Sequence, residues 1–123
     1  MFIEAEGITR CECGIIFVDN KYIQDMNLSY FNKNAPTDVI SFPLHTDGKS
    51  GIEGEVYISI EQAQFHASEY SVSVNAELQR LIVHGILHVV GYDDATAAEK
   101  RKMTYRENRY IKEFGHIEVW ASS

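Results

Sequence analysis

The chain has 123 residues, of which 45% are hydrophobic and 24% are charged, and its formal net charge is −7. This length and composition predict one globular domain and exclude disordered and fibrous proteins. The acidic balance excludes a protein that coats DNA through a general basic surface, and the longest strongly apolar stretch, Leu81 to Val90, is far shorter than the roughly 20 residues of a membrane-spanning helix.

The first half of the chain predicts two strands with a helix between them. The run from Cys11 to Asp19 begins with alternating hydrophobicity and becomes continuously apolar, as in a strand buried on both faces. Residues 20–31 predict a helix because three apolar residues recur at helical spacing: Ile23, Met26 and Tyr30. A second strand, Thr37 to Phe42, is rich in β-branched and aromatic residues and is expected to stop at Pro43.

The chain then turns from strand to helix. Residues 47–51 are typical of a loop, and Glu55 to Ile60 predict a third strand with alternate residues apolar. Residues 61–70 predict a helix. Two more helices follow, each with a capping signal at its start.

The capping signals are local. Ser73 or Asn75 caps a helix that ends at Gly91. The segment Thr96–Glu99 is a capping box for a last helix over residues 97–114. These signals set the expected bounds of both helices.

Strands followed by helices predict an α+β fold, in which a small mixed sheet packs against helices and the apolar helix of residues 76–90 is central. No repeat or linker divides residues 1–123, so a single domain is expected. The N-terminus lacks the basic start of a secretory signal, and Cys11 and Cys13 are awkwardly spaced for a mutual disulfide. We therefore expect a cytoplasmic protein with no membrane partner.

The most informative segment lies at the end of the central helix. His84 and His88 are four residues apart, so they lie one turn above the other and can share a metal ion. Because the helix is otherwise apolar, each imidazole needs a polar partner, and a metal ion satisfies both. Gly91 permits the turn by which the chain leaves the helix, and Asp94 can then fold back as a third ligand.

Other interpretations of this segment are open. The two histidines are also compatible with hydrogen-bonded core residues, and Asp93 and Asp94 with a turn before the next helix; the offset favours Asp94 over Asp93 as ligand. The spacing matches that of the metzincin proteases. Those proteases carry a glutamate as general base directly after the first histidine, and Gly85 at this position disfavours a peptidase.

Residues 84–94 read His-Gly-Ile-Leu-His-Val-Val-Gly-Tyr-Asp-Asp and resemble the signature of the bacterial YbeY family of endoribonucleases, His-Gly-x-Leu-His-x-x-Gly-Tyr-Asp-His. Residues 36–43 resemble the second motif of that family, and residues 54–59 its Gly-Asp-containing strand. The similarity runs from about residue 15 to residue 114. It implies a zinc-dependent, single-strand-specific endoribonuclease that acts in ribosomal RNA maturation and ribosome quality control.

The resemblance also implies a set of ligands and partners. One zinc ion per chain would be bound by the residues at the ligand positions of the signature: His84, His88 and Asp94. The expected partners are single-stranded or ribosomal RNA and the small ribosomal subunit, without DNA.

The chain departs from the family pattern in three places. Asp94 replaces the third histidine, which keeps a ligand but makes it anionic, so that a bound water is less acidic or a harder ion such as Mn²⁺ is accepted. Phe31 stands directly after Tyr30, where the family has an arginine, and Lys33 is a candidate substitute. The opening strand and helix of the family have little room before residue 11, so this unit is expected to be shortened, or the start is not the native one.

Further functional candidates follow from residue type and family position. Four side chains are expected to bind substrate: Lys33, Ser41, Arg101 and Arg106. The last two belong to a basic segment of the final helix, which can hold a phosphate backbone or serve as a solvated helix surface. Candidates for the general base are Glu55, Asp93 and the hydroxyl of Ser41. Three aromatic residues can stack on bases or belong to the core: Phe31, Tyr57 and Tyr92.

A different class of function is compatible with the same ligands. A non-catalytic RNA-binding module for ribosome assembly would use a closed structural metal site, with Cys11 or Cys13 as fourth ligand. A metalloprotease is the third and weakest interpretation.

Overall fold

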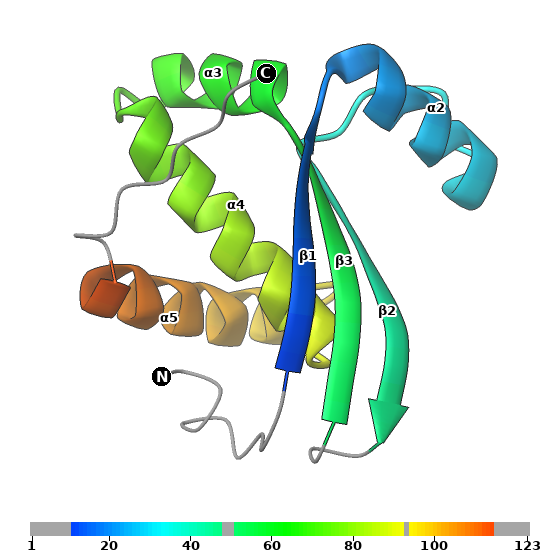
Figure 1. Cartoon of the computed structure of the whole chain (residues 1–123). Coiled ribbons are helices and arrows are strands. Elements are labelled where there is room, and N and C mark those ends of the chain that lie inside the picture. Colours follow the sequence, from blue (N-terminus) through cyan, green and yellow to red (C-terminus); the bar gives the residue numbers. More distant parts are fainter. Residues whose placement is uncertain (1–10, 48–50, 93, 115–123) are drawn as a thin grey trace.

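The computed structural model describes residues 11–47, 51–92 and 94–114. In chain order the described elements are β1 (Cys11–Val18), α2 (Asn20–Phe31), β2 (Val39–Asp47), β3 (Gly51–Ser59), α3 (Ile60–Glu69), α4 (Val74–Val89) and α5 (Ala97–Phe114). The predicted α+β class is therefore confirmed (Figure 1). None of the described helices combines the length and the apolar character needed to cross a bilayer.

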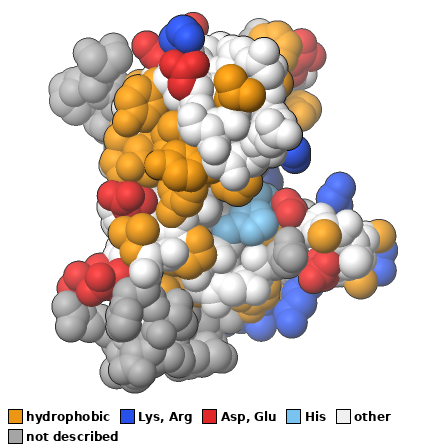
Figure 2. Space-filling model, turned by 90° about the vertical axis from the view of Figure 1, so that its right-hand side faces the viewer, with side chains coloured by type: hydrophobic (Ala, Val, Ile, Leu, Met, Phe, Trp, Pro, Cys, Tyr) orange, Lys and Arg blue, Asp and Glu red, His pale blue; other side chains and the backbone are white. Residues whose placement is uncertain are grey.

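The sheet has β3 in its centre. Its order is β1-β3-β2, with β3 parallel to β1 and antiparallel to β2. Helices α3, α4 and α5 lie on one side of this mixed sheet, and α2 lies on the other side near one end (Figure 1). That second side of the molecule faces the viewer in Figure 2.

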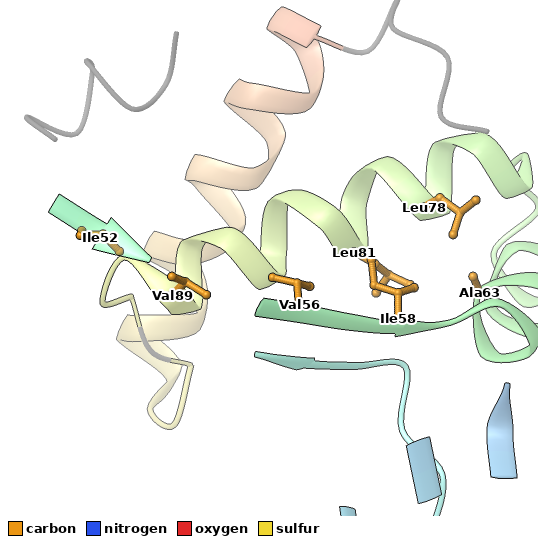
Figure 3. Close-up of a cluster of buried hydrophobic side chains, with 7 residues drawn as sticks. All are labelled: Ile52, Val56, Ile58, Ala63, Leu78, Leu81 and Val89. Atoms are coloured by element: carbon orange, nitrogen blue, oxygen red, sulfur yellow. The ribbon is translucent and has the colours of Figure 1, made fainter. Parts of the chain in front are cut away.

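The core lies between β3 and α4. Every second residue of β3 is buried against the helices, as expected of a strand with one covered face. The main cluster contains Ile52, Val56, Ile58, Ala63, Leu78, Leu81 and Val89 (Figure 3). Each large aliphatic side chain buried in this way contributes about 1.5–3 kcal/mol, so these contacts hold α4 against the sheet.

Two glycines let α4 approach β3 closely. A Cβ atom added to Gly85 would lie 2.4 Å from Cγ1 of Val56, and one added to Gly54 would lie 2.6 Å from Cγ1 of Val89. Both distances are too short for real contacts, so a larger residue at either position would push helix and strand apart. The same contact leaves no room for a glutamate at position 85, which argues further against the protease interpretation.

Strand β2 is longer than predicted. Pro43 does not end it; the strand continues to Asp47, with Pro43 opposite Gly54 and an irregularity in the register between Pro43 and His45. Proline is tolerated here because β2 is at the edge of the three-stranded sheet and the missing N–H need not face a neighbour. Strand β3 likewise begins at Gly51, earlier than expected, and residues 48–50 of the predicted loop lie outside the described residues.

Helix α2 differs from its predicted apolar stripe at one position. Ile23 is buried, but Tyr30 is 68% exposed, and its ring contacts Phe42 edge-on with the centroids 5.1 Å apart. Asn27 is buried, and its side-chain amide donates a hydrogen bond to the backbone oxygen of Ala35 at 3.0 Å. This bond ties the segment that follows the helix back to α2.

The predicted capping signals are confirmed. The hydroxyl of Ser73, rather than Asn75, caps α4 by accepting a hydrogen bond from the backbone N–H of Ala76 at 3.0 Å. Thr96 and Glu99 form the reciprocal capping box of α5, with separations of 3.0 and 3.1 Å. These caps fix where α4 and α5 begin and so where their side chains point.

Candidate metal centre and its cavity

Three candidate ligands meet at the C-terminal end of α4. The Nε2 atoms of His84 and His88 are 3.1 Å apart. Oδ2 of Asp94 is 3.6 Å from Nε2 of His84 and 3.5 Å from Nε2 of His88. Among the described residues, these three form the group whose donor atoms lie close enough together to hold a metal ion.

The separations fit a tetrahedral ion. Ligand atoms bound about 2.0–2.1 Å from a tetrahedral zinc ion lie about 3.3–3.4 Å from one another, and the measured separations are 3.1, 3.5 and 3.6 Å. Two imidazole nitrogens and one carboxylate oxygen are also a donor set that catalytic zinc sites use, with a fourth position open. The residues present therefore suit such an ion without a change in the fold.

Asp94 reaches the histidines because of the turn at Gly91. This glycine has φ = +112°, which a residue with a side chain rarely adopts. The N–H of Gly91 donates a hydrogen bond to the carbonyl oxygen of His88 at 3.1 Å, and the N–H of Tyr92 donates one to the carbonyl oxygen of Leu87 at 2.9 Å. This Schellman arrangement ends α4 and turns the chain back toward its last turn. Asp93, the rival ligand, lies outside the described residues.

A buried carboxylate is within hydrogen-bond distance of the ring nitrogen of His84 that does not face the other ligands. Oε2 of Glu107 on α5 lies 2.7 Å from Nδ1 of His84, and Glu107 is 5% exposed. When Nδ1–H donates this hydrogen bond, Nε2 is the donor atom left for a metal ion. Burial by itself lowers the pKa of His84, but the hydrogen bond and charge of Glu107, with Asp94 and Asp38, outweigh burial and raise the pKa above 6.5.

The polar network continues from Glu107 across the helices. Arg80 lies 3.5 Å from Glu107 and 3.9 Å from Glu77, measured from its guanidinium nitrogens to carboxylate oxygens. Nδ1 of His66 lies 3.8 Å from Oε2 of Glu77 and 3.5 Å from Oδ2 of Asp38. Burial raises the pKa of Glu77, although Arg80 and His66 oppose the rise. A continuous network of polar side chains thus joins α3, α4 and α5 to the residue that precedes β2.

An open cavity of about 700 Å³ lies over the three ligands. This volume is typical of ligand-binding clefts, which span about 300–1,000 Å³. Its other wall is formed by the end of α2, the segment after it and β2. Figure 2 shows histidine surface near the centre of this face, with hydrophobic side chains gathered beside it.

Two of the four residues predicted to bind substrate line the cavity, and two are not among its described lining residues. Lys33 and Ser41 line the cavity, whereas Arg101 and Arg106 are not among the described residues that line it. Among the described residues of α5, the basic one that lines a cavity beside the ligands is Lys100, in a smaller cavity of about 270 Å³ that His84 and Asp94 also line. A role of the two arginines in binding substrate therefore stays a prediction.

The general-base candidates are also separated by the fold. The hydroxyl of Ser41 donates a hydrogen bond to the backbone oxygen of Gly85 at 2.9 Å and so joins β2 to α4. Glu55 lies on the face of the sheet opposite to α3, α4 and α5, where it accepts a hydrogen bond from the hydroxyl of Tyr57 at 3.2 Å. Glu55 is not among the described residues that line the cavity.

Some of the aromatic and cysteine candidates line the cavity, and others lie elsewhere in the fold. Phe31, which is 48% exposed, and the half-buried Tyr92 line the cavity. Tyr57 shares the outer face of the sheet with Glu55. Cys13 packs against the main core cluster and does not belong to the metal-ligand group, and the side chain of Cys11 lies outside the described ones.

Sequence reasoning missed Glu107, Asp38 and Lys100. A signal for Glu107 exists: it lies four residues after Met103 and three before Tyr110, both buried, so it is an acid on the apolar stripe of α5. Asp38 and Lys100 carry no comparable signal.

The chain is similar to proteins of one family along most of its length. The family whose sequence model matches residues 2–115 is described as Endoribonuclease YbeY. A protein named Endoribonuclease YbeY from Chloroherpeton thalassium is 39% identical over 113 residues, which cover 92% of this chain and 75% of the relative. Its counterpart from Carboxydothermus hydrogenoformans is 43% identical over 101 residues, covering 82% and 71%.

A solved structure is similar as well. The solution structure of TM1509 from Thermotoga maritima superimposes with a TM-score of 0.65 at 27% sequence identity, and the match covers 94% of this chain and 76% of that one.

Proposed function

Because the chain belongs to the YbeY endoribonuclease family, we propose that it is a hydrolase that cleaves single-stranded RNA at a zinc centre formed by His84, His88 and Asp94. The observation that carries this proposal is the convergence of three metal-ligand atoms beneath an open cavity. A bound zinc ion would supply an acidified water and would polarise a phosphoryl oxygen.

The residues around the ligands have distinct tasks in this proposal. Glu107 orients His84 through its hydrogen bond at 2.7 Å. Asp94 replaces a neutral imidazole by a carboxylate and lowers the charge of the centre by one. Lys33, on the cavity wall, offers an ammonium group to an RNA phosphate. Ser41 holds α4 at its distance from β2.

The wider role follows from the family. We infer that the RNA is ribosomal, that the cleavage belongs to ribosomal RNA maturation and ribosome quality control, that the small ribosomal subunit is a partner, and that the protein works in the cytoplasm.

The two other interpretations have less support. A closed structural site needs a fourth protein ligand, and Cys13 packs in the core instead. A metalloprotease of the predicted type needs a glutamate at position 85, where an added Cβ already meets Val56 at 2.4 Å.

Metal analysis combined with an RNA cleavage assay tests the proposal. The purified protein should carry about one zinc ion per chain, cleave a single-stranded RNA oligonucleotide, and stop after chelation until zinc is restored. His88→Ala should lose both metal and cleavage, whereas Gln64→Ala, a change at an exposed position of α3 purified in the same way, should keep both. Equal cleavage by the His88→Ala protein would refute the proposed centre.

A further inference from the structure

An exposed aromatic ring stands at the wall of the cavity. Phe31 is the last residue of α2 and lines the same cavity as the three metal ligands. Its ring stacks on that of Phe42, with the centroids 6.1 Å apart and an angle of 17° between the ring planes. Phe31 remains 48% exposed and lines the cavity, so part of its surface is free to contact a ligand there.

The neighbouring rings hold Phe42 in place. Phe42 meets Tyr30 edge-on at 5.1 Å and Tyr57 edge-on at 5.9 Å, and Tyr57 in turn stacks on Tyr22 at 6.5 Å. Phe31 therefore rests on an aromatic cluster that extends from the cavity over the outer face of the sheet. These contacts fix the plane of the exposed ring before any ligand arrives.

The turn at the end of α2 places a lysine, Lys33, on the wall of the same cavity. Asn32 adopts a left-handed conformation with φ = 57°. Its N–H donates a hydrogen bond to the carbonyl oxygen of Leu28 at 3.1 Å, and the N–H of Lys33 donates one to the carbonyl oxygen of Asn27 at 3.2 Å. The chain reverses at this point, so Phe31 and Lys33 both line the cavity.

A flat apolar ring and an ammonium group on the wall of one cavity are suited to one nucleotide of a single strand. The face of an unpaired base can stack on an aromatic ring, while the adjoining phosphate binds a cation. In a duplex both faces of each base are covered by its neighbours, so this contact is closed to paired RNA. The net charge of −7 and the carboxylates of Asp38 and Asp94 on the cavity wall weaken a purely electrostatic capture of RNA.

We propose that Phe31 stacks on an unpaired base next to the scissile phosphate, with Lys33 on an adjoining phosphate, and that this contact selects single-stranded substrate. The inference rests on the proposed endoribonuclease function and adds the residue that recognises the base.

Steady-state cleavage of modified RNA tests the contact between Phe31 and an unpaired base. The substrates are one single-stranded oligonucleotide and a series in which an abasic nucleotide replaces each position in turn, with the zinc-loaded protein. Alanine substitution of a stacking aromatic costs about 1–3 kcal/mol per base, so Phe31→Ala should raise KM on the intact RNA by about 5- to 150-fold. At one abasic position, wild type and Phe31→Ala should have equal KM values, because the base that Phe31 contacts is gone.

Two further variants separate stacking from packing. Phe31→Tyr keeps the ring and should keep KM, whereas Phe31→Leu keeps apolar volume against Phe42 but should behave like Phe31→Ala. Tyr105→Ala removes an aromatic ring that is 65% exposed on α5 and is not among the residues described as lining the cavity, and it should leave KM unchanged.

The outcomes distinguish the two proposals. RNA left intact by the zinc-loaded wild type would refute the nuclease function and the stacking contact together. Cleavage with an unchanged KM in Phe31→Ala would refute the stacking contact alone. The stacking contact would also be refuted if Phe31→Ala raised KM over wild type by the same factor on every abasic RNA. Phe31 would then act on the shape of the cavity or on another partner.

Discussion

The contact between Gly85 and Val56 makes a quantitative prediction about stability. Gly85→Ala adds one methyl group, whose carbon would lie 2.4 Å from Cγ1 and 3.1 Å from Cγ2 of Val56. Overpacking costs about 1–3 kcal/mol, and a separation as short as 2.4 Å belongs to the upper part of that range, about 2–3 kcal/mol. The better helix propensity of alanine returns about 1 kcal/mol. We expect a net loss of about 1–2 kcal/mol, or a fall in Tm of about 3–10 °C.

A double-mutant cycle identifies the source of this loss. Val56→Ala alone should destabilise the protein by about 2 kcal/mol because it leaves a cavity. In the double variant the new methyl group occupies that cavity, so the double variant should be more stable than the sum of the single effects by about 1–2 kcal/mol. Urea unfolding at several temperatures gives the free energy of unfolding of wild type, of the two single variants and of the double variant.

Gly91→Ala is the matched control. A Cβ atom at Gly91 meets no atom within 4 Å, and the expected loss comes from φ = +112° alone, so Val56→Ala should not reduce it. Additive effects of Gly85→Ala and Val56→Ala, within about 0.5 kcal/mol, would refute the close contact between α4 and β3.

Three further predictions concern the polar residues. Glu107→Gln should weaken zinc binding by about 10- to 100-fold in competition with a chromogenic chelator, with the exposed Glu69→Gln as control; unchanged affinity would contradict the orienting role of Glu107. Asp94→Asn should lose most of the zinc affinity while Asp94→His retains it, and equal affinity of Asp94→Asn and wild type in a zinc titration would exclude Asp94 as a ligand. Burial raises the pKa of Glu77 above 4.5, so the folded protein holds this proton more tightly than the unfolded chain, and the associated stability is lost as pH rises through the raised pKa. Glu77→Gln should therefore lose less stability than wild type as the pH rises from 4.5 through the raised pKa; parallel curves of unfolding free energy against pH would contradict this.

What the sequence predicts well is local. The caps at Ser73 and Thr96, the Schellman turn at Gly91 and the pair His84 and His88 all depend on residues within a few positions of one another. Their geometry is set by backbone hydrogen bonds and helical periodicity, so the helices, their ends and the candidate ligands can be predicted from spacing alone.

What the sequence does not predict depends on tertiary contacts. The parallel pairing of β1 with β3 joins strands separated by α2 and β2, and Glu107 meets His84 across 23 positions. The extension of β2 through Pro43 depends on its place at the sheet edge, which requires the strand order. Arg101 and Lys100 are neighbours of the same charge, and only the packing of α5 decides that Lys100 borders the metal centre.

The short span of the ligands, from position 84 to position 94, has a consequence for the unfolded chain. A chain without tertiary structure still holds His84, His88 and Asp94 close together in sequence and so keeps part of its affinity for a metal ion. A ligand stabilises a fold only by the difference between its binding to the folded and unfolded chains. A thousandfold excess over Kd would give about 4 kcal/mol if the unfolded chain bound nothing, and the residual affinity reduces this gain. A bound metal ion would therefore stabilise the fold by less than its full binding free energy. The part that favours folding would be the part that depends on Glu107 and on the packed end of α4.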